Sequence, residues 1–104
     1  MAKPALIAKL TCLDGKRDDA IANFQQMFDH IATGEPGTEV YVLHEDADDP
    51  NVIYFYELYR DDAALATHGG SDTMKAVGRG LKGLLAGAPE LIKLSPRMAK
   101  GVDL

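Results

Sequence analysis

The feature that most constrains the fold is an almost unbroken apolar run from Val52 to Tyr59, followed by a polar, glycine-containing segment that reaches Met74. Residues in the run are β-branched, aromatic or aliphatic, apart from the single acid Glu57. A run of this length and composition is typical of a central strand that is buried on both faces. We therefore expect a sheet in which this strand is internal.

The segment after this strand carries two helix-start signals. Asp61 or Asp62 can cap a short helix, because a side-chain carboxylate accepts hydrogen bonds from the free N–H groups of the first turn. We expect that helix to end at His68, just before a Gly-Gly pair, and Ser71 to cap the next helix in the same way.

The remaining segments follow strand and helix periodicities. Strand-like alternation of apolar residues occurs in three more places: residues 4–13, 38–45 and 89 to about 97. Helical spacing occupies residues 16 to about 33 and the segment from Ser71 to Gly87. The resulting order, βαββαβ, predicts a ferredoxin-like α+β fold with an antiparallel sheet. A chain of 104 residues is enough for one domain and too short for two, so we expect a single domain over residues 1–104.

Glycines mark the expected helix ends. Gly34 predicts a left-handed cap for the first long helix, since Pro36 forbids its continuation. Gly78, Gly80 and Gly83 match G-x-G-x-x-G, but the dinucleotide-binding motif follows a strand and opens a helix. Here the glycines fall inside a helical pattern. We expect them either to permit close packing on the sheet or to leave room for a ligand between helix and sheet.

The helices of such a domain can cover only one face of the sheet. The other face would carry Ile7 and one of two pairs: Tyr54 and Tyr56, or Ile53 and Phe55. An exposed apolar patch of that size is unusual in a monomer. We therefore expect a homodimer in which a second copy packs sheet to sheet.

Charge and cysteine content narrow the functional classes. Eleven basic and sixteen acidic residues give a net charge of −5, whereas nucleic acids and anionic membranes attract basic surfaces. No apolar run approaches the roughly 20 residues of a membrane-spanning helix, and the first residues lack the apolar core of a signal peptide. The single cysteine, Cys12, is expected to be a small buried hydrophobe and gives no cysteine-based metal site. We expect a cytoplasmic protein that binds neither nucleic acid nor membrane.

His68 and Glu57 are the candidates for catalytic residues. Imidazole titrates close to neutral pH, so His68 could take a proton from a phenolic substrate; the alternative is a helix C-cap. A lone buried carboxylate is costly. Glu57 should therefore line a polar cavity or pair with Lys9, Arg60 or Arg79.

Hydroxyl groups supply the candidate substrate-binding residues, which are Tyr54, Tyr56, Tyr59 and Ser71. The tyrosines could instead be core or interface aromatics whose hydroxyls reach water, and Ser71 could act as a helix cap alone. The acidic segment 45–49 lacks the central glycine and distal glutamate of a calcium-binding loop. We expect a solvated turn there and no metal site.

The order of these residues resembles a known family. Glu57-Leu58-Tyr59, Asp61, Ala64-Leu65, His68 and Ser71 are similar to the E-x-W…D…AL…H-x-x-S run of the antibiotic biosynthesis monooxygenase superfamily. Tyr59 stands where that family often has Trp. The resemblance implies a dimeric α/β-barrel, with a ligand pocket between sheet and helices that His68 borders.

The family has several branches with different activities, and the residues at a few positions favour some of these branches over others. The haem-degrading branch is disfavoured, because the positions of its functional Asn, Trp and His correspond here to about Ala8, His68 and Gly78. The preferred interpretation is a cofactor-independent monooxygenase that acts on a quinol or polyphenol, with no bound cofactor. The alternative is a non-catalytic small-molecule-binding or stress-associated dimer of the same fold.

Overall fold

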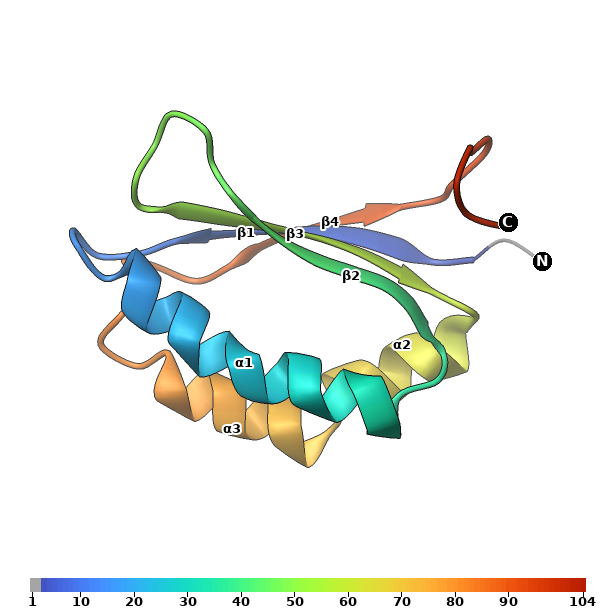
Figure 1. Ribbon diagram of the computed structural model, residues 1–104, viewed down its shortest axis with the longest axis horizontal. Helices are drawn as coiled ribbons and strands as arrows, with labels where there is room; N and C mark the ends of the chain where they lie inside the picture. Colours follow the sequence, from blue (N-terminus) through green and yellow to red (C-terminus); the bar gives the residue numbers. More distant parts are fainter. Residues whose placement is uncertain (1–2) are drawn as a thin grey trace.

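The computed structural model describes residues 3–104; the first two residues of the predicted domain lie outside this range. In chain order the elements are β1 (Ala5–Thr11), α1 (Arg17–Gly34), β2 (Thr38–Glu45), β3 (Val52–Tyr59), α2 (Asp62–Gly69), α3 (Asp72–Gly80) and β4 (Glu90–Leu94). The strands form one antiparallel sheet in the order β2-β3-β1-β4, and the helices lie along one of its faces (Figure 1). This confirms the ferredoxin-like α+β fold, with β3 inside the sheet.

The register of the strands determines which side chains face the helices. One row crosses the whole sheet and contains Tyr41, Glu57, Leu6 and Lys93, on β2, β3, β1 and β4 respectively. The neighbouring row contains Leu43, Phe55, Ala8 and Leu91. The buried core forms between this face and the helices, where the rings of Phe24 and Phe55 lie 4.7 Å apart in an edge-to-face contact.

No helix formed by residues 3–104 lies over the opposite face of the sheet (Figure 1). Tyr54 and Tyr56 lie on this face, because they alternate with the core residues Ile53 and Phe55 along β3. Ile7 pairs with Tyr56 on one side and with Ile92 on the other, and 53% of Ile92 is exposed. Of the two pairs that the sequence allowed for the uncovered face, the structure therefore has Tyr54 and Tyr56.

The helix that begins after Ser71 ends at Gly80, so the prediction that it reaches Gly87 is wrong. Gly83 has a φ of 80°, a left-handed conformation that turns the chain out of the helix. Backbone hydrogen bonds then hold the segment against the end of β1, from Leu13 N to Leu84 O and from Ala86 N to Thr11 O. β4 is also shorter than predicted, and its pairing with β1 ends where Leu94 meets Ala5.

The end of α1 departs from the sequence prediction in its backbone conformation. α1 does end at Gly34, but among the described residues only Gly15, Gly83 and Gly101 have positive φ, so a left-handed cap at Gly34 is wrong. The glycine serves a close approach instead. A Cβ built on Gly34 would lie 2.8 Å from Cε1 of His30, whose ring packs against this position.

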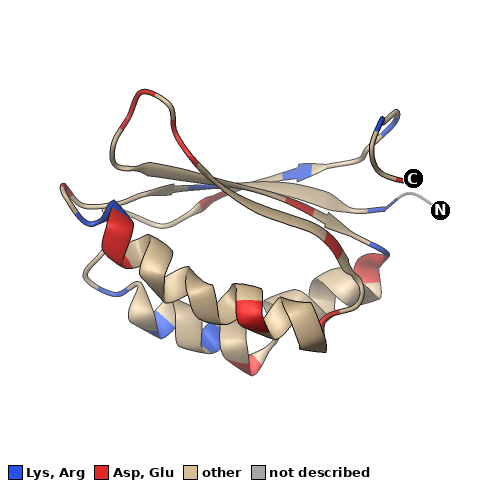
Figure 2. Cartoon of the chain, in the orientation of Figure 1, with Lys and Arg blue, Asp and Glu red and all other residues tan. Residues whose placement is uncertain are grey.

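The surface carries dispersed charge. Lys and Arg residues lie on several different elements, and acidic residues occur mainly in loops and near helix ends (Figure 2). Within residues 3–104, no helix combines the length and the apolar character needed to cross a membrane. Cys12 is buried, as expected from its position among apolar residues.

Candidate functional site

A cavity of about 520 Å³ lies between the helix-facing side of the sheet and the helices. Apolar side chains form most of its wall, among them Leu6, Phe55, Met74 and Val77. Polar groups enter it at Tyr41, Glu57, His68 and Lys93. Leu91 of the edge strand β4 also lines the cavity and is 63% exposed, which places the open side along β4.

Two helix caps position His68 at this cavity. Asp61 caps α2 by accepting a hydrogen bond from Ala64 N at 2.8 Å. Ser71 caps α3 by accepting from Met74 N at 3.0 Å, and its hydroxyl donates to the carbonyl oxygen of His68 at 3.0 Å. Both capping predictions are confirmed. The C-cap of α2 is Gly70, so the interpretation of His68 as a helix cap is wrong; His68 lies inside the last turn and only 3% of it is exposed.

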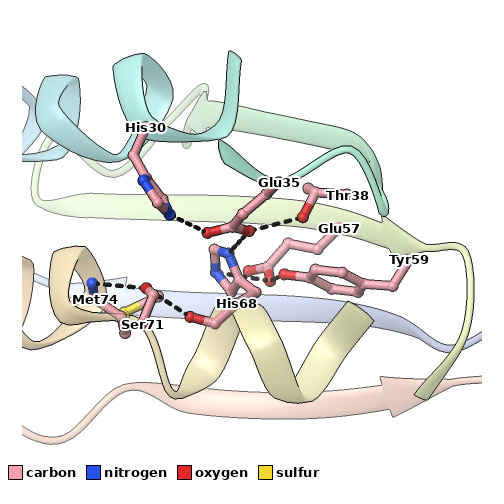
Figure 3. A network of polar contacts seen from close by, with 8 residues as sticks. All are labelled: His30, Glu35, Thr38, Glu57, Tyr59, His68, Ser71 and Met74. Carbon is pink, nitrogen blue, oxygen red and sulfur yellow. Dashed lines mark hydrogen bonds and ion pairs between the residues drawn. The ribbon is translucent and has the colours of Figure 1, made fainter. Parts of the chain in front are cut away.

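One side of the His68 ring faces a buried carboxylate that follows α1. Glu35 Oε1 lies 2.8 Å from Nδ1 of His68 and accepts a hydrogen bond from the Thr38 hydroxyl, also at 2.8 Å (Figure 3). The other oxygen, Oε2, lies 3.0 Å from Nε2 of His30. The Glu35 side chain is 2% exposed, whereas that of His30 is 32% exposed. The contacts therefore run from the protein surface at His30 to the cavity wall at His68.

The other side of the His68 ring faces Glu57. His68 Nε2 lies 3.9 Å from Glu57 Oε1, which is too long for a hydrogen bond. Within residues 3–104 this buried nitrogen has no hydrogen-bond partner. Glu57 is instead held by Tyr59, whose hydroxyl donates to Glu57 Oε1 (Figure 3).

Glu57 therefore lines a cavity, but the wall of this cavity is mostly apolar, unlike the polar cavity that was one of the two alternatives predicted. Two of the three basic residues proposed from sequence as partners of Glu57 make contacts with other groups. Arg60 pairs with Asp61 at 3.5 Å, and the Lys9 ammonium lies 5.9 Å from the ring centre of Tyr54 on the opposite face. The groups next to the Glu57 carboxylate are instead the Tyr59 hydroxyl and the imidazole of His68.

Burial has a direct effect on the titratable groups of the site. It raises the pKa of Glu57 above its ordinary value of 4.5, although the hydrogen bond from Tyr59 and the charge of His68 act in the opposite direction. Burial also raises the pKa values of Tyr41 and Tyr59, and the nearby Glu57 and Glu35 carboxylates add to this increase. Both phenols are consequently neutral near neutral pH.

Two tyrosine rings fix the plane of the imidazole. The ring centres of Tyr41 and Tyr59 lie 5.1 Å and 5.4 Å from that of His68. Tyr41 reaches the cavity, whereas Tyr59 is fully buried behind it. An imidazole held between two rings and a carboxylate presents its free nitrogen in one direction, which is the geometry that a general base requires.

The structure brings together some of the candidate residues and separates others. His68, Glu57 and Tyr59 form one cluster, and Ser71 holds the backbone of His68. Tyr54 and Tyr56 lie on the opposite face of the sheet and do not line the cavity in the described chain.

Sequence reasoning did not single out Glu35. The residue lies between Gly34 and Pro36, in what reads as an ordinary helix end. One signal was available: an acid beside a helix C-terminus opposes the helix dipole, so it needs compensating donors. Thr38 and His68 supply hydrogen bonds here, and His30 Nε2 lies 3.0 Å from the other carboxylate oxygen.

The glycines of α3 have separate functions. A Cβ on Gly80 would lie 2.0 Å from Asn23 Oδ1, so Gly80 permits the close approach of α1 and α3. Gly78 lines the cavity, and a Cβ there would meet no atom of the described chain within 4 Å. The predicted close packing on the sheet is wrong, because Gly80 packs against α1; room for a ligand, the other alternative, stays a prediction, although the space beside Gly78 is open. No group of three or more metal-binding side chains occurs in the described part of the chain.

Comparisons with known proteins agree with this architecture. A family model described as antibiotic biosynthesis monooxygenase matches residues 5–79. A solved structure of a candidate antibiotic biosynthesis monooxygenase from Caulobacter crescentus is 29% identical, with a TM-score of 0.87 over 93% of this chain and 92% of that one. A Pseudomonas aeruginosa protein is 31% identical, with a TM-score of 0.74 over 95% and 97% of the two chains. A Mycobacterium tuberculosis protein is 25% identical, with a TM-score of 0.83 over 96% and 99%. A search of curated proteins finds no match.

Proposed function

The chain belongs to the antibiotic biosynthesis monooxygenase family, and we propose that it is a cofactor-independent monooxygenase acting on a quinol or another polyphenolic small molecule. The observation that carries the proposal is the free Nε2 of His68, a buried ring nitrogen without a hydrogen-bond partner in residues 3–104 at the wall of a mostly apolar cavity. A buried polar atom of this kind is costly unless a ligand completes its hydrogen bonding. A phenol can hydrogen-bond to Nε2 through its hydroxyl, and its apolar ring can pack against the apolar wall of the cavity.

The proposed reaction begins with proton transfer. The substrate hydroxyl gives its proton to His68 Nε2, and the electron-rich phenolate that remains reduces molecular oxygen. For a simple quinol the balance is quinol plus O₂ giving hydroxyquinone plus water: one oxygen atom enters the ring and the other leaves as water. The substrate supplies the electrons, and the protein supplies a base, a dry cavity and orientation.

Glu57 and Tyr41 are proposed to orient the substrate. Both line the cavity next to His68, from adjacent positions on β3 and β2. Glu57 takes up a proton more readily than an exposed carboxyl because its pKa is raised, chiefly by burial. In its neutral form it can donate a hydrogen bond to a second substrate oxygen. Tyr54 and Tyr56 have no part in substrate binding in this proposal, because they face away from the cavity.

We also propose that the protein acts as a cytoplasmic homodimer. The uncovered face of the sheet carries exposed apolar side chains at Val42, Ile92 and Leu94, in addition to Tyr54 and Tyr56. A second copy packed on this face would remove these side chains from water. In this proposal the dimer stabilises the sheet by covering its exposed face, and each protomer contains its own cavity.

Oxygen uptake by the purified protein tests the proposed activity. The protein is mixed with a panel of hydroquinones, catechols and anthrone-type substrates, with a chelator present and no added metal or flavin. We expect enzyme-dependent oxygen consumption with at least one substrate and one molecule of oxidised product for each O₂ consumed. Saturable binding of these compounds without oxygen consumption would contradict catalysis and would favour the alternative of a non-catalytic binding protein.

A further inference from the structure

We infer that Glu35 is a positioning residue for His68: its carboxylate keeps the ring proton on Nδ1, leaves Nε2 as the acceptor in the cavity, and stabilises the imidazolium that forms when Nε2 takes a proton. This inference rests on the proposed function, since it assigns His68 as the base. Glu35 lies behind His68 and, in the described chain, outside the set of residues that line the cavity. It therefore acts through His68 and not on the substrate.

The tautomer follows from the hydrogen-bonding capacity of the two groups. An ionised carboxylate can only accept, so a short contact between Glu35 Oε1 and His68 Nδ1 requires the proton to be on Nδ1. A neutral imidazole carries one ring proton, and Nε2 is then an acceptor. The distance of 2.8 Å is typical of a charge-assisted hydrogen bond.

A hydrogen bond from Thr38 and a contact with His30 also hold the Glu35 carboxylate in place. The Thr38 hydroxyl donates to Oε1, and His30 Nε2 approaches Oε2 at 3.0 Å. The ring of His30 packs against Gly34, where a side chain would collide with it. Three groups from α1, β2 and α2 thus converge on one buried carboxylate, which accounts for a charge that the end of a helix would otherwise disfavour.

Groups from other elements also face His68, and their positions agree with the same tautomer. Glu57, on β3, is the one other carboxylate within 4 Å of a ring nitrogen of His68 in residues 3–104, and it lies 3.9 Å from Nε2. Its Oε1 already accepts a hydrogen bond from Tyr59, and 3.9 Å is too long for a hydrogen bond to His68 Nε2. The ring of Tyr41, on β2, is tilted by 57° to the imidazole, with the ring centres 5.1 Å apart. Glu35 is therefore the partner that decides where the proton lies.

The test separates this role from a purely structural one by reading the ring nitrogens directly. The protein is labelled with ¹⁵N in its histidine rings, and the His68 signals are assigned by their absence from a His68→Gln variant. In the wild-type protein, under conditions where the His68 ring carries a single proton, we expect that proton on Nδ1 and none on Nε2. A proton on Nε2 in the wild-type protein would overturn the inference, whether or not any variant folds.

Glu35→Gln keeps the size of the side chain and replaces one acceptor by a donor. We expect this variant to lose the single tautomer of the wild-type protein and to lose about 10²–10⁴ in kcat, the range expected when a general base is no longer correctly presented. KM should change little, because Glu35 does not reach the substrate. The matched control is Glu45→Gln, a 52% exposed carboxylate that pairs with Arg17 at 3.6 Å; it should leave tautomer and kcat unchanged.

Two outcomes for Glu35→Gln would overturn the inference: a wild-type tautomer, or a changed tautomer with full kcat. Absence of oxygen uptake by the wild-type protein with every substrate would instead overturn the proposed function. In that case the nitrogen signals still decide whether Glu35 sets the tautomer.

Discussion

The two faces of the sheet are built from alternate residues of the same strand, yet they differ completely in chemistry. On the covered face, Phe55, Glu57 and Tyr59 meet the helices, and the acid is held by a phenol beside a buried imidazole. On the other face, Tyr54 and Tyr56 are only partly buried, and Lys9 lies near the ring of Tyr54. The difference teaches that burial by the helices, more than residue type, decides which phenols can take part in a site.

Removing the imidazole from the covered face should have the largest effect. We expect His68→Ala to lower kcat of the proposed oxidation by about 10²–10⁴-fold, the usual contribution of a positioned general base. Because His68 is buried and Glu35 would lose its partner, the variant should also lose about 1–3 kcal/mol of stability. Turnover is therefore measured well below the melting temperature of the variant.

The matched variant on the uncovered face is Tyr54→Phe. It removes a phenolic hydroxyl from the same strand but from the side away from the cavity. Turnover should remain within about twofold of wild type. A loss of turnover comparable to that of His68→Ala would contradict our assignment of the reaction to the covered face of the sheet.

A charge on the uncovered face should break the proposed dimer. Ile92→Lys places an ammonium group on that face at the edge strand β4, beside Ile7, where a partner copy would have to desolvate it. Sedimentation or light scattering of wild type should give twice the chain mass of 11.2 kDa, and of the variant a single chain mass. A wild-type protein that stays monomeric at high concentration would remove the dimer from the proposal.

Two glycines of α3 allow a paired test of the cavity wall. Gly80→Ala should destabilise the protein by about 1–3 kcal/mol, because Asn23 must move and lose its hydrogen bond to Val77 O, which is 2.9 Å long. Gly78→Ala places a methyl group in open space and should stabilise the helix by up to about 1 kcal/mol. Chemical denaturation measures both, and equal effects of the two substitutions would contradict the packing described here.

The smallest expected effect concerns pH. Because the pKa of Glu57 is raised in the folded protein, the folded state holds a proton that the unfolded state releases first. The free energy of unfolding should therefore fall as pH rises from about 4.5 through the raised pKa. Glu57→Gln removes this contribution, so the stability of wild type relative to the variant should decline over that interval. A constant difference across the interval would show that the pKa is not raised.

Most of the fold could be predicted from sequence because strand and helix periodicities do not depend on distant contacts. The register of the sheet was harder. The run 52–59 is apolar at nearly every position, so alternation alone could not decide whether Phe55 or Tyr56 faces the helices. The end of α3 was misjudged for a related reason: Leu84 and Leu85 continue the helical spacing, whereas backbone pairing with β1 holds them in place.

The candidate site could be predicted only in part. His68, Glu57 and Tyr59 lie close together in sequence, and the strand–turn–helix order brings them into one cluster. Glu35 is 33 residues from His68, and only a tertiary contact between the end of α1 and α2 brings them together. Its role could not be deduced from spacing along the chain.

The most direct test of the difference between the two faces is to map where a substrate-like molecule binds. The ¹⁵N-labelled protein is titrated with a hydroquinone under anaerobic conditions, so that binding is observed without turnover. We predict that backbone amide signals of the cavity residues His68, Gly69 and Gly78 shift progressively with ligand concentration, while those of Tyr54 and Tyr56 stay in place. Shifts confined to Tyr54, Tyr56 and their neighbours on the uncovered face would contradict a binding site between the sheet and the helices.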